Sequence, residues 1–153
     1  MALTVGNLAA SLAEGGIRHH LDAEAAAIRV VFVTRHYVNP RDERLAIVRL
    51  ELTDGGNTCR VTLPRAFPAG SEVAATCLAL CEAVGDVPLA RVEHDATTGT
   101  LQLAAETPVE DGSLTPRQIF ALLDAIVEAA EAGQLAIEPG GSEGRAAAPR
   151  EAA

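Results

Sequence analysis

The sequence predicts an α+β domain in which five antiparallel strands form one sheet with helices against it, in the order α-β-β-β-α-β-β-α. Short stretches that alternate apolar and polar residues, joined by tight turns, predict the strands. Stretches with apolar residues at helical spacing and recognisable capping residues predict the helices. The 17 Leu, 13 Val and 6 Ile residues among 153 are enough for one core, so we expect one domain over residues 1–137.

The first helix is predicted to begin after Thr4, which can cap it, and to end at Gly15-Gly16. Leu8 and Leu12 lie at helical spacing between these ends. Residues 26–35 then predict a strand with both faces partly covered. One face of this strand carries Ile28, Val30 and Phe32, and the other carries Arg29, Val31 and Val33.

Residues 36–43 contain Asn-Pro and several charges, and they predict a loop before the next strand. Residues 45–53 alternate cleanly and predict a half-buried strand. Its inner face carries Ala46, Val48, Leu50 and Leu52. The turn Asp54-Gly55-Gly56-Asn57 predicts a tight hairpin, after which Cys59, Val61 and Leu63 point inward from a strand over residues 58–63.

Pro64 and Pro68 are expected to stop the sheet, because proline cannot donate a ladder hydrogen bond. A helix follows Gly70-Ser71 and ends at Gly85. Its predicted apolar stripe is Val73, Cys77, Leu80, Cys81 and Val84. Residues 91–95 and 100–105 then predict a second hairpin.

The last helix has the strongest local signal. Thr115, Pro116 and Gln118 combine an N-cap, a first-turn proline and a capping glutamine, while Leu114 and Ile119 can form a hydrophobic staple. Gly133 is the expected stop. The predicted apolar stripe is Ile119, Leu122, Leu123, Ile126 and Ala130, and the solvated side carries Asp124, Glu128 and Glu131. Residues 138–153 form a Gly/Ala-rich stretch that we expect to be disordered.

The element order and the C-terminal motifs resemble the YbjN-like family, whose fold is similar to that of type III secretion chaperones. The resemblance covers roughly residues 4 to 133 and rests on three segments. These are Leu101-Gln102-Leu103, Thr107-Pro108-Val109-Glu110-Asp111-Gly112, and Leu114-Thr115-Pro116-Arg117-Gln118 with the helix after it. The family often has an asparagine where Cys81-Glu82 stands, and the loop 37–43 looks enlarged here. The resemblance implies the α+β fold and carries over no catalytic residue.

Composition argues against several classes of partner. Twelve arginines, no lysine and 21 acidic residues give a net charge of −9, which would repel nucleic acid and anionic lipid, so neither is an expected partner. The four aromatic residues are too few for a base-stacking platform. Charges interrupt every apolar run, and the first residues show no secretory signal, so we expect a cytoplasmic protein.

Three cysteines, Cys59, Cys77 and Cys81, are the first candidates for chemistry. Cys77 and Cys81 would share a helix face and, with Cys59, could in principle ligate a metal. Their coincidence with apolar positions instead favours small buried hydrophobes. We therefore predict reduced thiols that hold no metal.

Histidines and carboxylates are the second candidates. His19 and His20 are adjacent, so in an extended segment they point to opposite faces and cannot chelate one ion; convergence in space with His36 or His94 stays open. Glu106, Glu110 and Asp111 are expected on a solvated rim. No serine elbow or phosphate loop is present, so we assign no catalytic, cofactor-binding or metal-binding residue and expect no cofactor.

Two functional hypotheses follow. The first is a non-enzymatic protein-binding module, chaperone-like or regulatory, that holds a protein client through an exposed sheet face or edge and forms a homodimer. The alternative is a metal- or thiol-dependent enzyme or redox domain built on Cys59, Cys77, Cys81 and the histidines. The direction in which the three thiols point discriminates between them.

Overall fold

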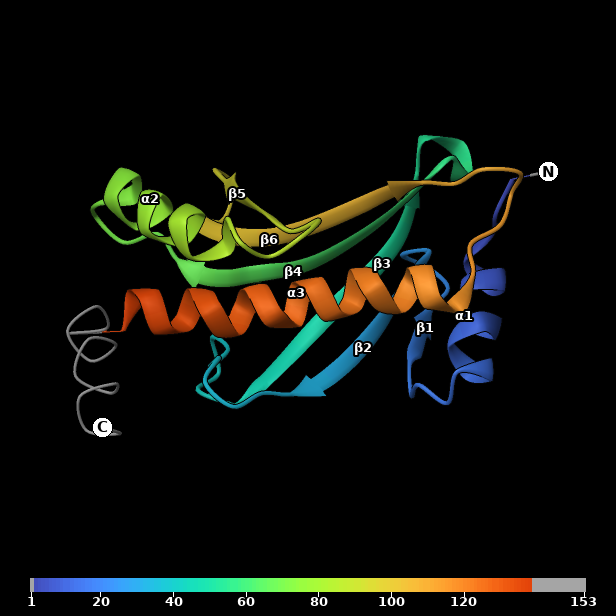
Figure 1. Cartoon of the computed structure of the whole chain (residues 1–153), viewed down its shortest axis with the longest axis horizontal. Helices are drawn as coiled ribbons and strands as arrows, with labels where there is room; N and C mark the ends of the chain where they lie inside the picture. Colours follow the sequence, from blue (N-terminus) through green and yellow to red (C-terminus); the bar gives the residue numbers. More distant parts are fainter. Residues whose placement is uncertain (1, 139–153) are drawn as a thin grey trace.

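The computed structural model describes residues 2–138. These residues form one antiparallel sheet of six strands with helices packed against it (Figure 1). The spatial order of the strands is β1-β2-β3-β4-β6-β5. Their bounds are β1 His20–Asp22, β2 Ala27–Val33, β3 Leu45–Thr53, β4 Thr58–Pro68, β5 Arg91–Asp95 and β6 Thr100–Pro108. Every neighbouring pair is antiparallel, which confirms the predicted α+β class.

Three helices lie on one face of the sheet, and the longest, α3 (Pro116–Ile137), runs along it (Figure 1). Helix α1 (Val5–Glu14) packs against α3 and β2, whereas α2 (Val73–Val84) packs against α3 and β5. The core fills the space between the two layers. Its largest fully buried side chains are Tyr37, Phe67, Leu8, Leu12, Ile28, Leu50, Leu80, Leu101, Leu103, Ile119, Leu122 and Leu123.

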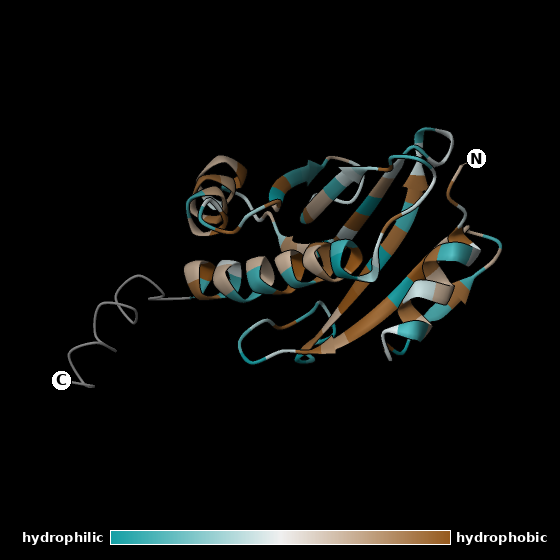
Figure 2. Ribbon diagram, turned by 45° about the vertical axis from the view of Figure 1, so that its right-hand side comes forward, coloured by the Kyte–Doolittle hydropathy of each residue, from teal (hydrophilic) through white to brown (hydrophobic). Residues whose placement is uncertain are grey.

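The strands obey the predicted alternation. Ile28 and Val30 on β2, and the alternate residues from Ala46 to Leu50 on β3, are buried beneath the helices. Figure 2 shows the resulting alternation of hydrophilic and hydrophobic residues along the strands. The partial cover expected on the other face of β2 is not found, because Val31 and Val33 there are 54% and 84% exposed.

Helix caps are the features that the sequence predicted most accurately. Thr115 accepts a hydrogen bond from the Gln118 backbone N–H at 3.2 Å, and the Gln118 side chain accepts one from the Thr115 N–H at 2.8 Å. Thr4 and Asn7 form the same reciprocal arrangement at the start of α1. The 3₁₀ turn η1 (Asp54–Gly56) closes the β3–β4 hairpin, with Gly55 and Gly56 at positive φ.

The expectation of five strands is wrong, because β1 adds a sixth. It has three residues, and it pairs with only Ala27–Arg29 of β2. Two of its residues are exposed, and such a short polar segment has no alternation to reveal it. The pairing is therefore set by the chain returning from α1 and not by a local pattern.

Pro64 does not end β4, contrary to the prediction, and the strand continues to Pro68. The pairing with β6 shifts register between Leu63 and Phe67, so Pro64 lies in a bulge where no ladder partner needs its N–H. Arg65 in this bulge has a φ of 51°. The irregularity returns Ala66 and Phe67 to the core, where both are buried. Strand β6 likewise runs past Ala105 to Pro108.

Gly133 is not the end of the last helix, because α3 continues to Ile137. A Cβ at this glycine would lie 2.7 Å from Cζ of Phe67 and 3.1 Å from a Leu80 methyl carbon. The glycine is therefore present for close packing between α3, β4 and α2, and not as a helix stop.

Glu131 was predicted on the solvated side of α3, but its carboxylate holds the loop after β2. It accepts hydrogen bonds from the backbone N–H groups of Arg35, His36 and Tyr37 at 2.8, 3.0 and 2.7 Å. The Gln134 side chain accepts another from the Val38 N–H at 3.2 Å. Helix α3 thus fixes the loop 34–44 and, with it, the ends of β2 and β3.

None of the three helices in residues 2–138 combines the length and apolar composition that crossing a membrane requires. The predicted disordered stretch, residues 138–153, lies outside the described part of the chain from residue 139 onward, and Glu138 is the C-cap of α3.

Candidate functional site

The face of the sheet opposite the helices divides into a polar half and an apolar half. On β4, β5 and β6, long charged side chains lie over the strands and bury Thr62 and Ala104, which are 5% and 0% exposed. On β2, the outward side chains of Val31 and Val33 are exposed to solvent. Apolar contact area is therefore available on the β2–β3 half.

Arg60 is the centre of the polar half. Its guanidinium contacts Glu93 and also lies 3.5 Å from Glu106, while Arg91 lies 2.9 Å from Glu93 and 3.0 Å from Glu106. The hydrogen bond from Arg60 lowers the pKa of Glu93 to about 2, against partial burial, and the Gln102 amide adds to the effect. Two positive and two negative charges balance, so this network offers little net attraction to a partner.

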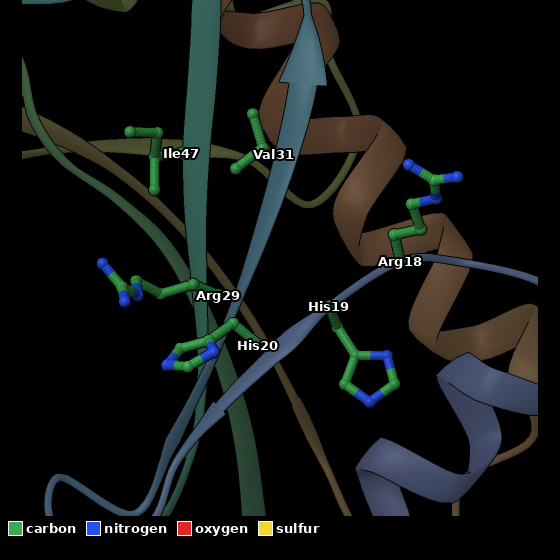
Figure 3. A pocket seen from close by; sticks show the side chains of 6 residues that line it. All are labelled: Arg18, His19, His20, Arg29, Val31 and Ile47. Carbon is green, nitrogen blue, oxygen red and sulfur yellow. The ribbon is translucent and has the colours of Figure 1, made fainter.

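A hollow of about 430 Å³ opens on the apolar half, beside β1 (Figure 3). It is lined by Arg18, His19, His20, Arg29, Val31 and Ile47. Arg18 and His19 precede β1, His20 is its first residue, and β2 and β3 supply the others. No acidic side chain belongs to this lining.

Strand register places three basic side chains in one row, and two of them, His20 and Arg29, line the hollow. His20 is directly opposite Arg29, and Arg29 is directly opposite Arg49. Glu51 lies 3.4 Å from Arg49 and balances that charge. Arg18 and Arg29, both exposed, form no ion pair with any residue in 2–138. Like charges at directly opposed positions destabilise a sheet, and the ion pair of Arg49 with Glu51 offsets part of this cost.

Apolar surface adjoins this basic row. Val31 and Val33 follow Arg29 at two-residue spacing on the same face of β2, and Ile47 lies directly opposite Val31 on β3. Because β1 pairs with only the first three residues of β2, the edge from Val30 to Val33 has no strand partner among the described residues. An apolar strip with a positive end and an open edge results.

The three cysteines do not converge. Cys59 is fully buried near the start of β4. Helix α2, which carries Cys77 and Cys81, follows the other end of β4, and an extended strand of this length separates its two ends by roughly 30 Å. Burial raises the pKa of the Cys59 thiol to about 11. Cys81 is exposed, so its prediction as part of the buried stripe is wrong; Cys77 is half-buried. Partial desolvation and the Cys77 thiol raise the pKa of Cys81, which disfavours its reactive thiolate form.

The histidines are also separated. His19 and His20 were predicted on opposite faces, but both line the hollow, with their imidazoles pointing in different directions (Figure 3). Nδ1 of His19 lies 3.0 Å from the Ile17 carbonyl oxygen. His36 lies in the loop after β2, and His94 is exposed on β5. Within residues 2–138, no three His, Cys, Asp or Glu side chains form a group that could hold a metal ion.

The predicted rim carboxylates have different environments. Glu110 and Asp111 are exposed at the turn after β6, in agreement with the prediction. Glu106 is exposed as well, and it also belongs to the Arg60 network. The sequence predicted that Arg29 and Val31 share a face of one strand and that Ile47 lies on a face of the next strand. It did not predict the hollow that these residues line together. Only the strand register brings these residues together, and Arg18 gave no signal at all.

A search of solved structures finds the crystal structure of YbjN from E. coli, described as a candidate transcription regulator. The two chains superimpose with a TM-score of 0.55 and 15% sequence identity, and the match covers 92% of each chain. The chain has a YbjN-like fold. This fold was predicted from the resemblance of the C-terminal motifs. No family model matches the sequence, and no curated protein matches it significantly. At 15% identity the likeness to YbjN concerns the fold and not the function.

Proposed function

We propose that this protein is a non-enzymatic protein-binding module that holds an extended segment of a client against the β2–β3 half of its sheet. The observation that carries the proposal is the uncovered apolar strip beside the hollow, with Val31 54% and Val33 84% exposed. Exposed apolar surface of this kind, rimmed by polar residues, is typical of interaction sites.

Self-association is the second part of the proposal. The β5 edge carries Arg91, Glu93 and Asp95, and charged side chains discourage pairing there. The β2 edge from Val30 to Val33 has no such protection, so we propose that two copies pair along it as a homodimer. Such a pair leaves the outer faces of both sheets open to a client.

The alternative, a metal- or thiol-dependent enzyme, has less support. It requires the thiols and histidines to act together, and they lie on separate elements. Raised thiol pKa values at Cys59 and Cys81 also work against nucleophilic or ligating thiolates. No observation within residues 2–138 favours this reading over the binding module.

Affinity capture from the native cell with matched variants tests client binding. Val31→Thr/Val33→Thr keeps side-chain shape and β propensity while it removes apolar contact. Leu78→Gln removes an equally exposed apolar side chain, 62% exposed on α2, and is the control. We expect proteins that wild type and Leu78→Gln retain to be lost from the double variant, as measured by quantitative mass spectrometry. Identical sets of captured proteins would contradict the proposal.

Light scattering combined with elemental analysis tests the dimer and the alternative on one sample. We expect twice the chain mass at micromolar concentration and no stoichiometric zinc. We also expect Cys77→Ala to leave dimerisation intact, because a half-buried thiol contributes only packing. A strict monomer that carries one zinc ion per chain would reject the module and support the metal-dependent alternative.

A further inference from the structure

The basic row in the hollow points to the chemistry of the client. Resting on the proposed function, we infer that the β2–β3 strip recognises an extended peptide in which an Asp or Glu is followed or preceded, at two-residue spacing, by apolar residues. The carboxylate contacts Arg29 or Arg18, whose side chains extend to different sides of the hollow (Figure 3), and the apolar side chains cover Val31, Val33 and Ile47.

Charge complementarity carries the first step. The hollow holds two arginines and two histidines in its lining, and neither arginine has an ion-pair partner in residues 2–138. Arg29 also lies directly opposite Arg49, which is paired with Glu51, so Arg29 keeps a positive charge that is unpaired among the described residues, beside another guanidinium. Guanidinium groups bind planar carboxylates through two parallel hydrogen bonds, which makes Asp and Glu side chains suitable ligands.

The two-residue spacing of the side chains on β2 favours an extended peptide. Arg29, Val31 and Val33 point to the same side of β2 because each is two residues from the next. An extended peptide that lies along this strand also presents every second side chain to it. The charge-apolar-apolar order of β2 is therefore matched by an acidic-x-apolar-x-apolar peptide, in either chain direction.

A peptide fits this surface better than a nucleic acid. The six residues that line the hollow include no Phe, Tyr or Trp, so stacking with a base would be limited to the imidazoles of His19 and His20. The net charge of −9 repels a phosphate backbone at long range, whereas a peptide with one or two carboxylates is affected much less. Val31 and Ile47 would gain nothing from contact with a sugar-phosphate chain.

Selection from a phage-displayed random dodecapeptide library on the full chain tests the inference. We expect wild type to enrich peptides with Asp or Glu two residues from an apolar residue. Arg18→Gln/Arg29→Gln should lose this acidic preference, while Arg117→Gln, an exposed arginine in the first turn of α3, should keep it. Circular dichroism checks that all three proteins are folded.

The most enriched peptide is then synthesised with a fluorescein label, and its affinity is measured by anisotropy. Replacing its Asp or Glu by Asn or Gln should weaken binding to wild type about tenfold or more, and the difference should shrink as salt is raised. The same replacement should change binding to Arg18→Gln/Arg29→Gln by less than about twofold.

The outcomes separate this inference from the proposed function. Enrichment of apolar peptides with no acidic preference overturns the inference and leaves the binding module standing. Enrichment no greater than on a surface without protein overturns both. Acidic selection that persists in Arg18→Gln/Arg29→Gln, displacement by a single-stranded oligonucleotide, or loss of dimer mass in that variant also overturns the inference, because the hollow would then have another occupant.

Discussion

Glu131 holds a long loop in place through one carboxylate. It accepts three consecutive backbone N–H groups, from Arg35 to Tyr37, that would otherwise have no acceptor where the chain leaves β2. Partial burial disfavours the charged form, but the three backbone hydrogen bonds outweigh it and hold the pKa of Glu131 below its usual value. The charge is therefore part of the fold and not of a solvated helix face.

Glu131→Ala should lower the free energy of unfolding by about 1–3 kcal/mol, because three backbone donors lose their acceptor. Glu128→Ala, at an exposed position one turn earlier on α3, should change it by less than about 0.5 kcal/mol. Urea denaturation of the two variants beside wild type measures the difference. Equal midpoints for all three proteins would show that the loop 34–44 contributes nothing to stability.

The acid dependence of stability tests the same residue by its charge. Because the folded-state pKa of Glu131 is lowered, its contribution is present above the ordinary glutamate pKa and is lost as pH falls through the lowered folded value. Glu131→Gln should therefore show a shallower loss of stability with acid than wild type. Parallel acid limbs in the two proteins would contradict this assignment.

Gly133→Ala should destabilise the protein, although alanine is the better helix former by about 1 kcal/mol. The new methyl group would lie 2.7 Å from Phe67 Cζ, and overpacking of this kind costs about 1–3 kcal/mol. Gly6→Ala on α1 is the matched control, since its nearest neighbour is 3.7 Å away, and it should be neutral or stabilising. Thermal melts that rank the two variants in the opposite order would contradict the packing argument.

At the scale of the element, local chemistry decides which boundaries the sequence can predict. The Thr115 cap and the alternation of β3 were predicted correctly because both depend on neighbours within a few residues. The bulge at Pro64 and the helix through Gly133 were not, because each depends on contacts with distant strands and helices. Strand β1 was missed because its pairing with β2 comes from topology.

Thr115→Ala should cost on the order of 1 kcal/mol, because the Gln118 N–H loses its side-chain acceptor. Leu114→Ala should add a further cost, since the buried Leu114 side chain precedes the cap and can pack against Ile119 as a hydrophobic staple. Denaturant melts of the single and double variants measure both effects. Stability equal to wild type in both single variants would mean that this motif does not position α3.

The candidate site exists because the strand register brings residues from three strands together. Composition argued against nucleic acid, and the expected exposed sheet with no reactive constellation favoured a binding module. The basic row exists only because His20, Arg29 and Arg49 pair across three strands. A single sequence gives the side on which each residue points, and it does not give the residue that lies opposite. This is why the strand faces could be predicted and the hollow could not.

Deleting residues 139–153 should leave the thermal midpoint almost unchanged. The apolar periodicity ends near Ile137, and a Gly/Ala-rich stretch cannot offset the entropy of ordering it. Differential scanning calorimetry of the shortened and full chains measures the change. A drop of more than a few degrees, about 1 kcal/mol for a domain of this size, would show that the stretch packs on the domain.

Tyr37 is an intrinsic spectroscopic probe of the fold. It is the single tyrosine of a chain without tryptophan, and its ring is fully buried edge-on to Phe67 with the hydroxyl donating to the Ala66 carbonyl at 3.0 Å. Near-ultraviolet absorbance and fluorescence therefore come almost entirely from one site within the Glu131-bound loop. Burial raises the pKa of Tyr37 to about 12, so in an alkaline titration the tyrosinate band should stay suppressed well above pH 10 and rise as this corner opens.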